Sequence, residues 1–192
     1  MEAVKKKEED MFQDIETQRD TYTTEDIYAM PDGTRAELID GKIYYMAPPS
    51  TNHQRLINYL ITEINLYIRK GEGGCEVFPA PFAVFLNKNN KNYIEPDISV
   101  ICDKDKIDEK GCHGAPDWVI EIVSPGSRSM DYYKKLFKYR TEGVREYWVV
   151  DPDRKLVTVY HFEKDTMVEY AFGEDVPAGI YDGYSINIPQ DL

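Results

Sequence analysis

The sequence predicts a mixed α/β (α+β) domain in which helices flank a mixed central sheet and a β-hairpin lies near the amino terminus. Three features support this prediction: a hairpin-forming dipeptide, one long segment with helical periodicity, and several β-rich runs interrupted by a second helix. Strands that alternate with both hairpins and helices are typical of mixed sheets. A chain of 192 residues is long enough for one domain with a sizeable core.

We assign residues 1–20 to a charged amino-terminal arm, because they contain few apolar anchors, and residues 21–192 to a single domain. The hairpin comes early in this domain. Its strands are predicted at residues 35–39 and 42–46, on either side of Asp40-Gly41, a dipeptide that tolerates the positive φ angles of a tight turn.

A long amphipathic helix is predicted after Pro48-Pro49. Thr51 lies three residues before Gln54, which is the spacing of a capping box, so we expect the helix to begin there. Its apolar residues recur with helical period, at Leu56, Ile57, Leu60, Ile61, Ile64 and Ile68.

The central sheet is predicted from three β-rich runs, at residues 75–86, 93–102 and 118–123, with a charged loop between the second and the third. A second helix is predicted over residues 131–142. It should end at Gly143, because glycine accepts the left-handed conformation found at helix ends. Further strands are predicted at residues 146–150, 156–162, 167–172 and 184–188.

The formal net charge of −12, taken alone, argues against a polyanionic partner. The acidic excess lies at the two ends of the chain, however. Residues 126–145 carry six basic and two acidic side chains, which is a local charge of +4. The charge pattern therefore neither excludes nor requires nucleic acid.

The three cysteines form no Cys-x-x-Cys pair, so we expect reduced thiols and neither a disulfide framework nor a zinc knuckle. The first residues lack the apolar segment of a secretory signal. No stretch approaches the roughly 20 apolar residues of a membrane span. We therefore expect a cytoplasmic protein with no membrane partner.

Carboxylates within apolar strands indicate a candidate site. Glu121 lies in the middle of the run 118–123, where an unpaired charge would be too costly to persist. Asp97 follows Pro96, which removes a ladder donor and indicates a bulge or a strand edge. Two carboxylates from neighbouring strands suit a hard cation such as Mg²⁺. The alternative is that each carboxylate pairs with a surface base, and the residues alone support this alternative and the metal site about equally.

Lys135 is the third candidate, because it lies beside the apolar stripe of the second helix, whereas Lys134 lies on the opposite side. We expect the ammonium of Lys135 to approach Glu121 closely, with Val123 facing the same cleft without a polar role. The alternative is that the stem of Lys135 covers apolar surface while its ammonium stays in water. The spacing alone does not decide between them.

These residues belong to an ordered series that runs from about Tyr22 to Ile188. The series resembles the Uma-two family of putative restriction endonucleases, a branch of the PD-(D/E)XK nuclease superfamily. The resemblance implies a restriction-endonuclease-like fold and a metal-dependent endonuclease that acts on nucleic acid, with DNA as the expected substrate. It rests on residues 37–42, 48–50 and 53–54, Pro96-Asp97, residues 121–125, Asp131, Lys135, Tyr139 and residues 143–148.

The resemblance also implies roles for individual residues. Asp97 and Glu121 would hold Mg²⁺ or Mn²⁺, and Glu37 would be a supporting metal or water ligand, although its strand parity alone slightly favours a cross-strand salt bridge. Val123 stands where the superfamily has the lysine of its Glu-x-Lys motif, and the family offers Lys135 as the replacement. A departure of this kind leaves an alternative function, a nuclease-fold domain that binds or assembles without catalysis.

Three further residues are expected to contact nucleic acid. Arg128 and Lys138 would hold phosphates. For His53, a capping or half-buried structural role is about as well supported as a phosphate contact. Glu95 shares strand parity with Asp97 and is a candidate accessory carboxylate. Nucleases often need two sites for two strands, which suggests a homodimer.

Overall fold

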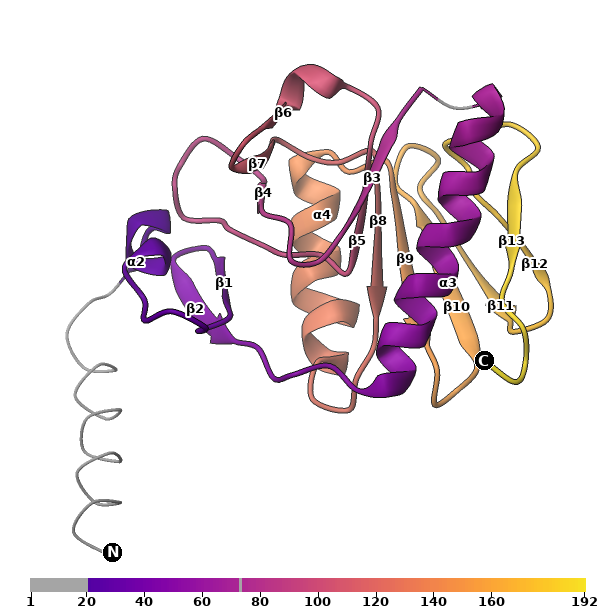
Figure 1. The fold of residues 1–192 in the computed structure, drawn as a ribbon, viewed down its shortest axis with the longest axis horizontal. Coiled ribbons are helices and arrows are strands. Elements are labelled where there is room, and N and C mark those ends of the chain that lie inside the picture. The colour runs from indigo at the N-terminus through magenta and orange to yellow at the C-terminus, as the bar shows by residue number, and fades with distance from the viewer. Residues whose placement is uncertain (1–20, 73) are drawn as a thin grey trace, which may run out of the picture.

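The computed structural model describes residues 21–72 and 74–192, and the predicted arm, residues 1–20, lies outside the described residues (Figure 1). A six-stranded sheet with the strand order β11-β10-β9-β8-β5-β3 forms the centre. The pairing of β8 with β9 is parallel and the other four pairings are antiparallel, so the predicted mixed sheet is confirmed. The strands are β3 (Glu76–Pro79), β5 (Ile98–Ile101), β8 (Trp118–Ile122), β9 (Glu146–Asp151), β10 (Leu156–His161) and β11 (Thr166–Ala171).

Two helices cover the two faces of this sheet, α3 (Thr51–Tyr67) on one and α4 (Leu136–Glu142) on the other (Figure 1). Alternation along β8 divides its side chains between the two layers. Trp118 and Ile120 pack in the layer of α3, whereas Val119 packs in the layer that contains Tyr139 of α4. Glu121 has the parity of Val119 and therefore lies on the α4 side of the sheet.

The predicted hairpin is confirmed as β1 (Ala36–Ile39) and β2 (Lys42–Tyr45), which form a small sheet of their own. Asp40 and Gly41 make the turn, with φ angles of 50° and 77°. Backbone hydrogen bonds between Leu38 and Tyr93 attach the hairpin to the segment that leads into β5. Every residue of β1 is buried.

The long helix α3 is confirmed, but its predicted capping box is wrong. Ser50, with extended backbone, is the N-cap, and its hydroxyl accepts a 3.2 Å hydrogen bond from the amide of His53. Thr51 is already the first helical residue, so its side chain is one position too late to cap. The π-helical turn η1 (Ile68–Glu72) continues α3.

The second predicted helix consists of a π-helical segment, η3 (Met130–Lys135), followed by α4. It ends at Gly143, whose φ of 95° confirms the predicted left-handed C-cap.

Two shorter helical elements complete the described fold. The short helix α2 (Thr24–Tyr28) precedes the hairpin, and η2 (Lys104–Lys106) is a single 3₁₀ turn.

The run at residues 75–86 is divided between two sheets, because Pro79 and Pro81 cannot donate to a ladder. Its second part, β4 (Val84–Phe85), joins β6 (Ile107–Asp108) and β7 (Gly111–His113), which lie in the segment predicted as a loop. Near the carboxyl terminus, β13 (Ser185–Asn187) pairs with β12 (Asp175–Pro177), a strand that the sequence pattern did not predict.

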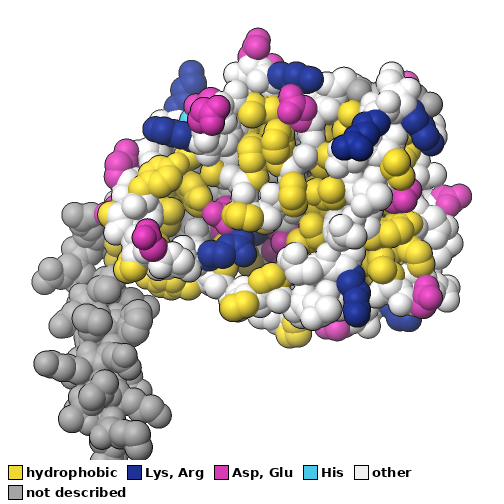
Figure 2. Space-filling view, viewed as in Figure 1, with side chains coloured by type: hydrophobic (Ala, Val, Ile, Leu, Met, Phe, Trp, Pro, Cys, Tyr) yellow, Lys and Arg dark blue, Asp and Glu magenta, His cyan; other side chains and the backbone are white. Residues whose placement is uncertain are grey.

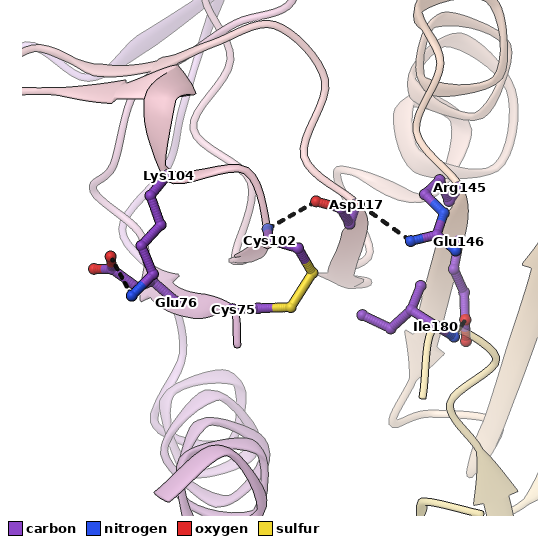
Figure 3. Close-up of a disulfide and its surroundings, with 8 residues drawn as sticks. All are labelled: Cys75, Glu76, Cys102, Lys104, Asp117, Arg145, Glu146 and Ile180. Carbon is purple, nitrogen blue, oxygen red and sulfur yellow. Dashed lines mark hydrogen bonds and ion pairs between the residues drawn. A yellow bond between two sulfur atoms is a disulfide. The ribbon is translucent and has the colours of Figure 1, made fainter. Parts of the chain in front are cut away.

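The expectation of reduced thiols is wrong for two of the three cysteines (Figure 3). Glu76 pairs with Ile101 across β3 and β5, so the next residues outward, Cys75 and Cys102, face one another and form a disulfide across 27 positions of sequence. Spacing within the chain does not reveal such a register. Cys112 is free and buried, and burial raises the pKa of its thiol to about 11.

Among the described residues, no helix combines the length and the apolar character needed to cross a membrane.

Candidate active site

Asp97 and Glu121 come together because of the register between β5 and β8. Ile98 pairs with Ile120, so Asp97, just before β5, lies opposite Glu121. The Asp97 amide donates a 3.4 Å hydrogen bond to Oε2 of Glu121, and the Ile122 amide donates a 2.8 Å hydrogen bond to Oδ2 of Asp97. Both carboxylates line a cavity of about 780 Å³.

Lys135 enters the same cavity from the α4 side of the sheet. Its Nζ lies 2.9 Å from Oε1 of Glu121 and 2.9 Å from Oε1 of Glu37, and its side chain is only 5% exposed. The predicted approach of Lys135 to Glu121 is therefore confirmed. Val123 lines the same cavity, as expected, whereas Lys134 is exposed and donates to the hydroxyl of Tyr44.

The π-helical segment η3 helps to place the lysine. Lys135 is its last residue and Asp131, one turn earlier, lies 4.0 Å from the ammonium. The backbone carbonyl of Asp131 accepts a hydrogen bond from the hydroxyl of Tyr147 in β9, which ties this segment to the sheet. Wide helical turns of this kind frequently occur at functional sites.

Tyr139 completes the buried surroundings of Glu121. Its hydroxyl donates a 2.7 Å hydrogen bond to Oε1 of Glu121, the oxygen that also accepts from Lys135. Neither Tyr139 nor Asp131 was predicted to act in the site. Two signals could have indicated them: the i,i+4 spacing of Asp131 and Lys135, and the position of Tyr139 on the apolar stripe beside Lys135.

Carboxylates outnumber cations here, because Glu37, Glu121 and Asp131 lie within 4.0 Å of the Lys135 ammonium and Asp97 lies beside Glu121. Burial raises the pKa of Glu121 well above its usual range; Lys135 opposes this shift, and the neighbouring carboxylates add to it. Burial likewise raises the pKa of Asp131 to about 6. Burial disfavours the charged form of Lys135 and would lower its pKa. The attraction of Glu121, Glu37 and Asp131 outweighs this effect of burial and raises the pKa of Lys135 well above its usual range. Lys135 is therefore protonated at neutral pH.

The oxygen atoms of Asp97 and Glu121 suit a hard divalent cation. Among the described residues, the side chain of Asp97 forms its hydrogen bonds, with His53 and the Ile122 amide, through Oδ2. Lys135 and Tyr139 both bind Oε1 of Glu121. This leaves Oδ1 of Asp97 and, apart from the long amide contact, Oε2 of Glu121 without a hydrogen-bond partner among the described residues. Mg²⁺ is commonly bound through one or two carboxylates, with water and phosphate oxygens completing its shell.

Protein side chains alone do not form a metal site with three or more ligands in the described part of the chain, which holds no group of three or more His, Cys, Asp or Glu side chains arranged for a metal. Zinc sites use three or four such ligands.

Glu37 and His53 both lie in the cavity, in contact with the predicted site residues. Glu37 accepts a 3.1 Å hydrogen bond from the Glu95 amide in addition to its bond with Lys135, so its ionic partner is a helical lysine and not a cross-strand base. Nε2 of His53 lies 3.1 Å from Oδ2 of Asp97. Burial disfavours the charged ring, but Asp97 outweighs this and raises the pKa of His53.

Glu95 does not join the Asp97 cluster. Its carboxylate accepts hydrogen bonds of 2.8 Å from Arg35 and 2.8 Å from the hydroxyl of Tyr93. The side chain is therefore bound on the hairpin side of the site, and only its backbone amide contacts Glu37.

Arg128 and Lys138 do not line the cavity either. Arg128 binds both carboxylate oxygens of the buried Asp151, and Lys138 lies 2.5 Å from Asp40 and 3.0 Å from Glu142. The structure therefore pairs both predicted phosphate-binding side chains with acidic residues of the chain itself.

Comparisons with known proteins agree with this fold. Two Synechocystis proteins are similar to this chain. The first, described as uncharacterized protein slr1290, is 29% identical over 131 residues, which is 67% of this chain and 67% of that protein. The second, described as uncharacterized protein sll1609, is 27% identical over 133 residues, which is 68% of this chain and 72% of that protein. The crystal structure of a "putative nuclease belonging to DUF820" from Anabaena variabilis superposes with a TM-score of 0.71 at 22% identity, covering 88% of this chain and 96% of the other. This likeness confirms the predicted nuclease fold.

The sequence profile of the Uma2 family, described as "Putative restriction endonuclease", matches residues 24–186. This match spans the hairpin, both helices and the whole central sheet. The chain therefore belongs to the Uma2 family of nuclease-like proteins.

Proposed function

We propose that this protein is a metal-dependent endonuclease that hydrolyses phosphodiester bonds of nucleic acid, with DNA as the expected substrate, in the cavity described above. One observation carries the proposal: a protonated lysine lies 2.9 Å from Glu121 in a cavity that Asp97 also lines. Two carboxylates that can hold a cation, together with a cationic hydrogen-bond donor, are groups that metal-assisted hydrolysis of a phosphodiester uses. Family membership supports the same reaction class.

Asp97 and Glu121 would hold Mg²⁺ or Mn²⁺ through Oδ1 of Asp97 and Oε2 of Glu121, the oxygen atoms that the lysine, the tyrosine and the histidine leave free. When bound, such a cation lowers the pKa of a water molecule and screens the charge of the phosphate. Lys135 remains protonated, so it acts as a hydrogen-bond donor and not as a base. Its ammonium would orient the attacking water and stabilise negative charge that develops on the phosphate.

Glu37, Tyr139 and His53 are positioning residues in this proposal. Glu37 holds the ammonium of Lys135 from the hairpin side, and Tyr139 fixes Oε1 of Glu121 from the α4 side. His53 holds Oδ2 of Asp97. Because each of these side chains binds a proposed catalytic group, the site is ordered before a substrate arrives.

A cleavage assay tests the proposed activity. The full chain with Mn²⁺ should cut at least one substrate in a panel of single- and double-stranded DNA and RNA at low salt, and Asp97→Asn should abolish the cleavage. Asp182→Asn is the matched control, because Asp182 is exposed and outside the cavity lining. Equal product from wild type and Asp97→Asn on every substrate would refute the endonuclease and support a non-catalytic, nuclease-fold binding domain.

Calorimetric titration with Mn²⁺ tests the proposed ligands separately from turnover. Asp97→Asn and Glu121→Gln should each weaken Mn²⁺ binding, whereas Lys135→Met should bind the ion and lose most of its turnover, because the lysine serves the transition state more than the ground state. Unchanged Mn²⁺ affinity in both carboxylate variants would remove these residues as ligands.

A further inference from the structure

The entrance of the cavity is apolar on the side of the hairpin. Tyr45, the last residue of β2, and the connection to α3 that follows it line the cavity. This stretch consists of Tyr45, Met46, Ala47, Pro48 and Pro49, and we call it the 45–49 rim. Tyr45 is 64% exposed. An aromatic ring held at the end of a paired strand can stack on a flat ligand without a large loss of conformational entropy.

Cations, by contrast, are scarce around the entrance. Apart from His53, only Arg35 and Lys135 contribute basic side chains to the described lining, and Lys135 is enclosed by carboxylates. Arg35 binds Glu95 through Nη2, and its side chain is 36% exposed, so the guanidinium keeps donors that a phosphate in the cavity can reach. This is enough for about one phosphate.

The basic segment 126–145 does not supply a second line of phosphate contacts. All six of its basic side chains have partners within the chain: Arg128 with Asp151, Lys134 with Tyr44, Lys135 with Glu121, Lys138 with Asp40, Arg140 with Asp165, and Arg145 with Glu163. On the face of the molecule that Figure 2 shows, Lys and Arg side chains lie scattered among Asp and Glu and are not gathered into a band.

These observations bear on the substrate of the proposed nuclease. Proteins that follow a duplex commonly neutralise about 6–10 phosphates, which requires a continuous basic surface. Single strands expose the faces of their bases, and each base stacked on an aromatic side chain contributes about 1–3 kcal/mol of binding. A cavity of about 780 Å³ also lies in the size range of small-ligand sites.

We propose that the cavity accepts single-stranded nucleic acid, with the ring of Tyr45 stacked on a base beside the phosphate that Arg35 and Lys135 contact. This inference rests on the proposed function, because it names the substrate class of the same site. Tyr45 is then a specificity-determining residue that selects unpaired nucleotides.

Fluorescence anisotropy of the full chain in EDTA tests the inference without cleavage. The probes are labelled oligothymidylate and oligouridylate of about 12 nucleotides and a hairpin duplex of similar length. Both single strands should bind at least about tenfold more tightly than the duplex. The logarithmic salt slope for the single strands should be about −1 to −2, since few phosphates are neutralised.

Two variants of Tyr45 locate the contact. Tyr45→Leu should weaken single-strand binding about 5- to 150-fold, whereas Tyr45→Phe, which keeps the ring, should bind like wild type. Tyr28→Leu is the control, because Tyr28 is also exposed but lies outside the cavity lining. In addition, 2-aminopurine in the single strand should change fluorescence on binding to wild type and not to Tyr45→Leu, which reports stacking directly.

The outcomes separate this inference from the proposed function. Duplex binding as tight as single-strand binding, or equal single-strand affinity of wild type and Tyr45→Leu, overturns the single-strand inference even where Mn²⁺-dependent cleavage is observed. Ring-dependent single-strand binding without cleavage supports the inference and refutes the endonuclease.

Discussion

The ammonium of Lys135 lies 2.9 Å from Oε1 of Glu37, although the two residues are 98 positions apart in the sequence. One belongs to the end of η3 and the other to β1, so this contact joins the hairpin to the helical layer. Both side chains are about 5% exposed. At this depth an ion pair is costly to break, because the remaining partner keeps its charge without compensation.

Lys135→Met should lower the free energy of unfolding at neutral pH by about 3–5 kcal/mol, because it leaves buried carboxylates without their cation. The loss should be smaller near pH 5, where carboxylates such as Asp131, with a pKa of about 6, take up protons. Urea denaturation at both pH values measures the effect. Lys134→Met, at the exposed neighbouring position, should change stability by about 1 kcal/mol or less. An equal effect of the two substitutions would contradict the assignment of the buried ion pair.

Glu146 gives a pH dependence away from the site. It accepts hydrogen bonds from the indole of Trp148 and the amide of Ile180 (Figure 3 shows Glu146 and Ile180), and burial raises its pKa from 4.5 to about 7. Between these values the folded state binds more protons than the unfolded state, so Glu146 makes stability fall as the pH rises from about 4.5 to about 7.

Glu146→Gln should remove that contribution. Between pH 5 and pH 8, the stability of the variant relative to wild type should rise by about 2–3 kcal/mol. Urea titrations of both proteins at each pH provide the comparison, since the contributions of most other groups cancel in the difference. A constant difference across this range would show that Glu146 does not titrate there.

Reduction of the Cys75–Cys102 disulfide should lower the free energy of unfolding by about 3–4 kcal/mol, as expected for a closed loop of about 27 residues. Guanidinium denaturation with and without a phosphine reductant measures the change. The double variant Cys75→Ser/Cys102→Ser is the control and should not respond to the reductant. Identical midpoints for oxidised and reduced wild type would argue against the cross-link.

The start of α3 offers a matched pair of cap substitutions. Ser50→Ala should destabilise the protein by about 1 kcal/mol, because the amide of His53 loses its side-chain acceptor. Thr51→Ala should have little effect or stabilise slightly, since alanine favours helix interiors and Thr51 is exposed. Thermal unfolding of both variants measures the difference, and a larger loss for Thr51→Ala would restore the capping box that the sequence suggested.

Local patterns predicted much of the fold and one contact of the site. The hairpin turn at Asp40-Gly41 and the end of the second helix at Gly143 follow from the backbone freedom of those residues. The approach of Lys135 to Glu121 followed from helical periodicity. In each case the deciding interactions lie within a few residues or on one face of one element.

Contacts set by the register between distant strands could not be predicted in the same way. The disulfide depends on the alignment of β3 with β5. In the sequence, the basic side chains of residues 126–145 are candidates for phosphate contacts, because acidic partners such as Asp151 for Arg128 and Asp40 for Lys138 lie in other elements and become neighbours only after folding. Composition records the charges of a segment but not which of them are neutralised after folding.

The separation of the hairpin from the central sheet has a consequence for thermal inactivation. Strands β1 and β2 form no ladder with the six-stranded sheet. The hairpin is attached by the packing of the buried β1 and by individual contacts, such as Leu38 with Tyr93, Glu37 with Lys135 and Asp40 with Lys138. Such a unit can open locally at a lower free energy than global unfolding requires. Opening it would expose Lys135 and remove the 45–49 rim while β8 and β9 stay paired. A melting temperature recorded from the sheet would therefore overestimate the temperature at which the site is still assembled.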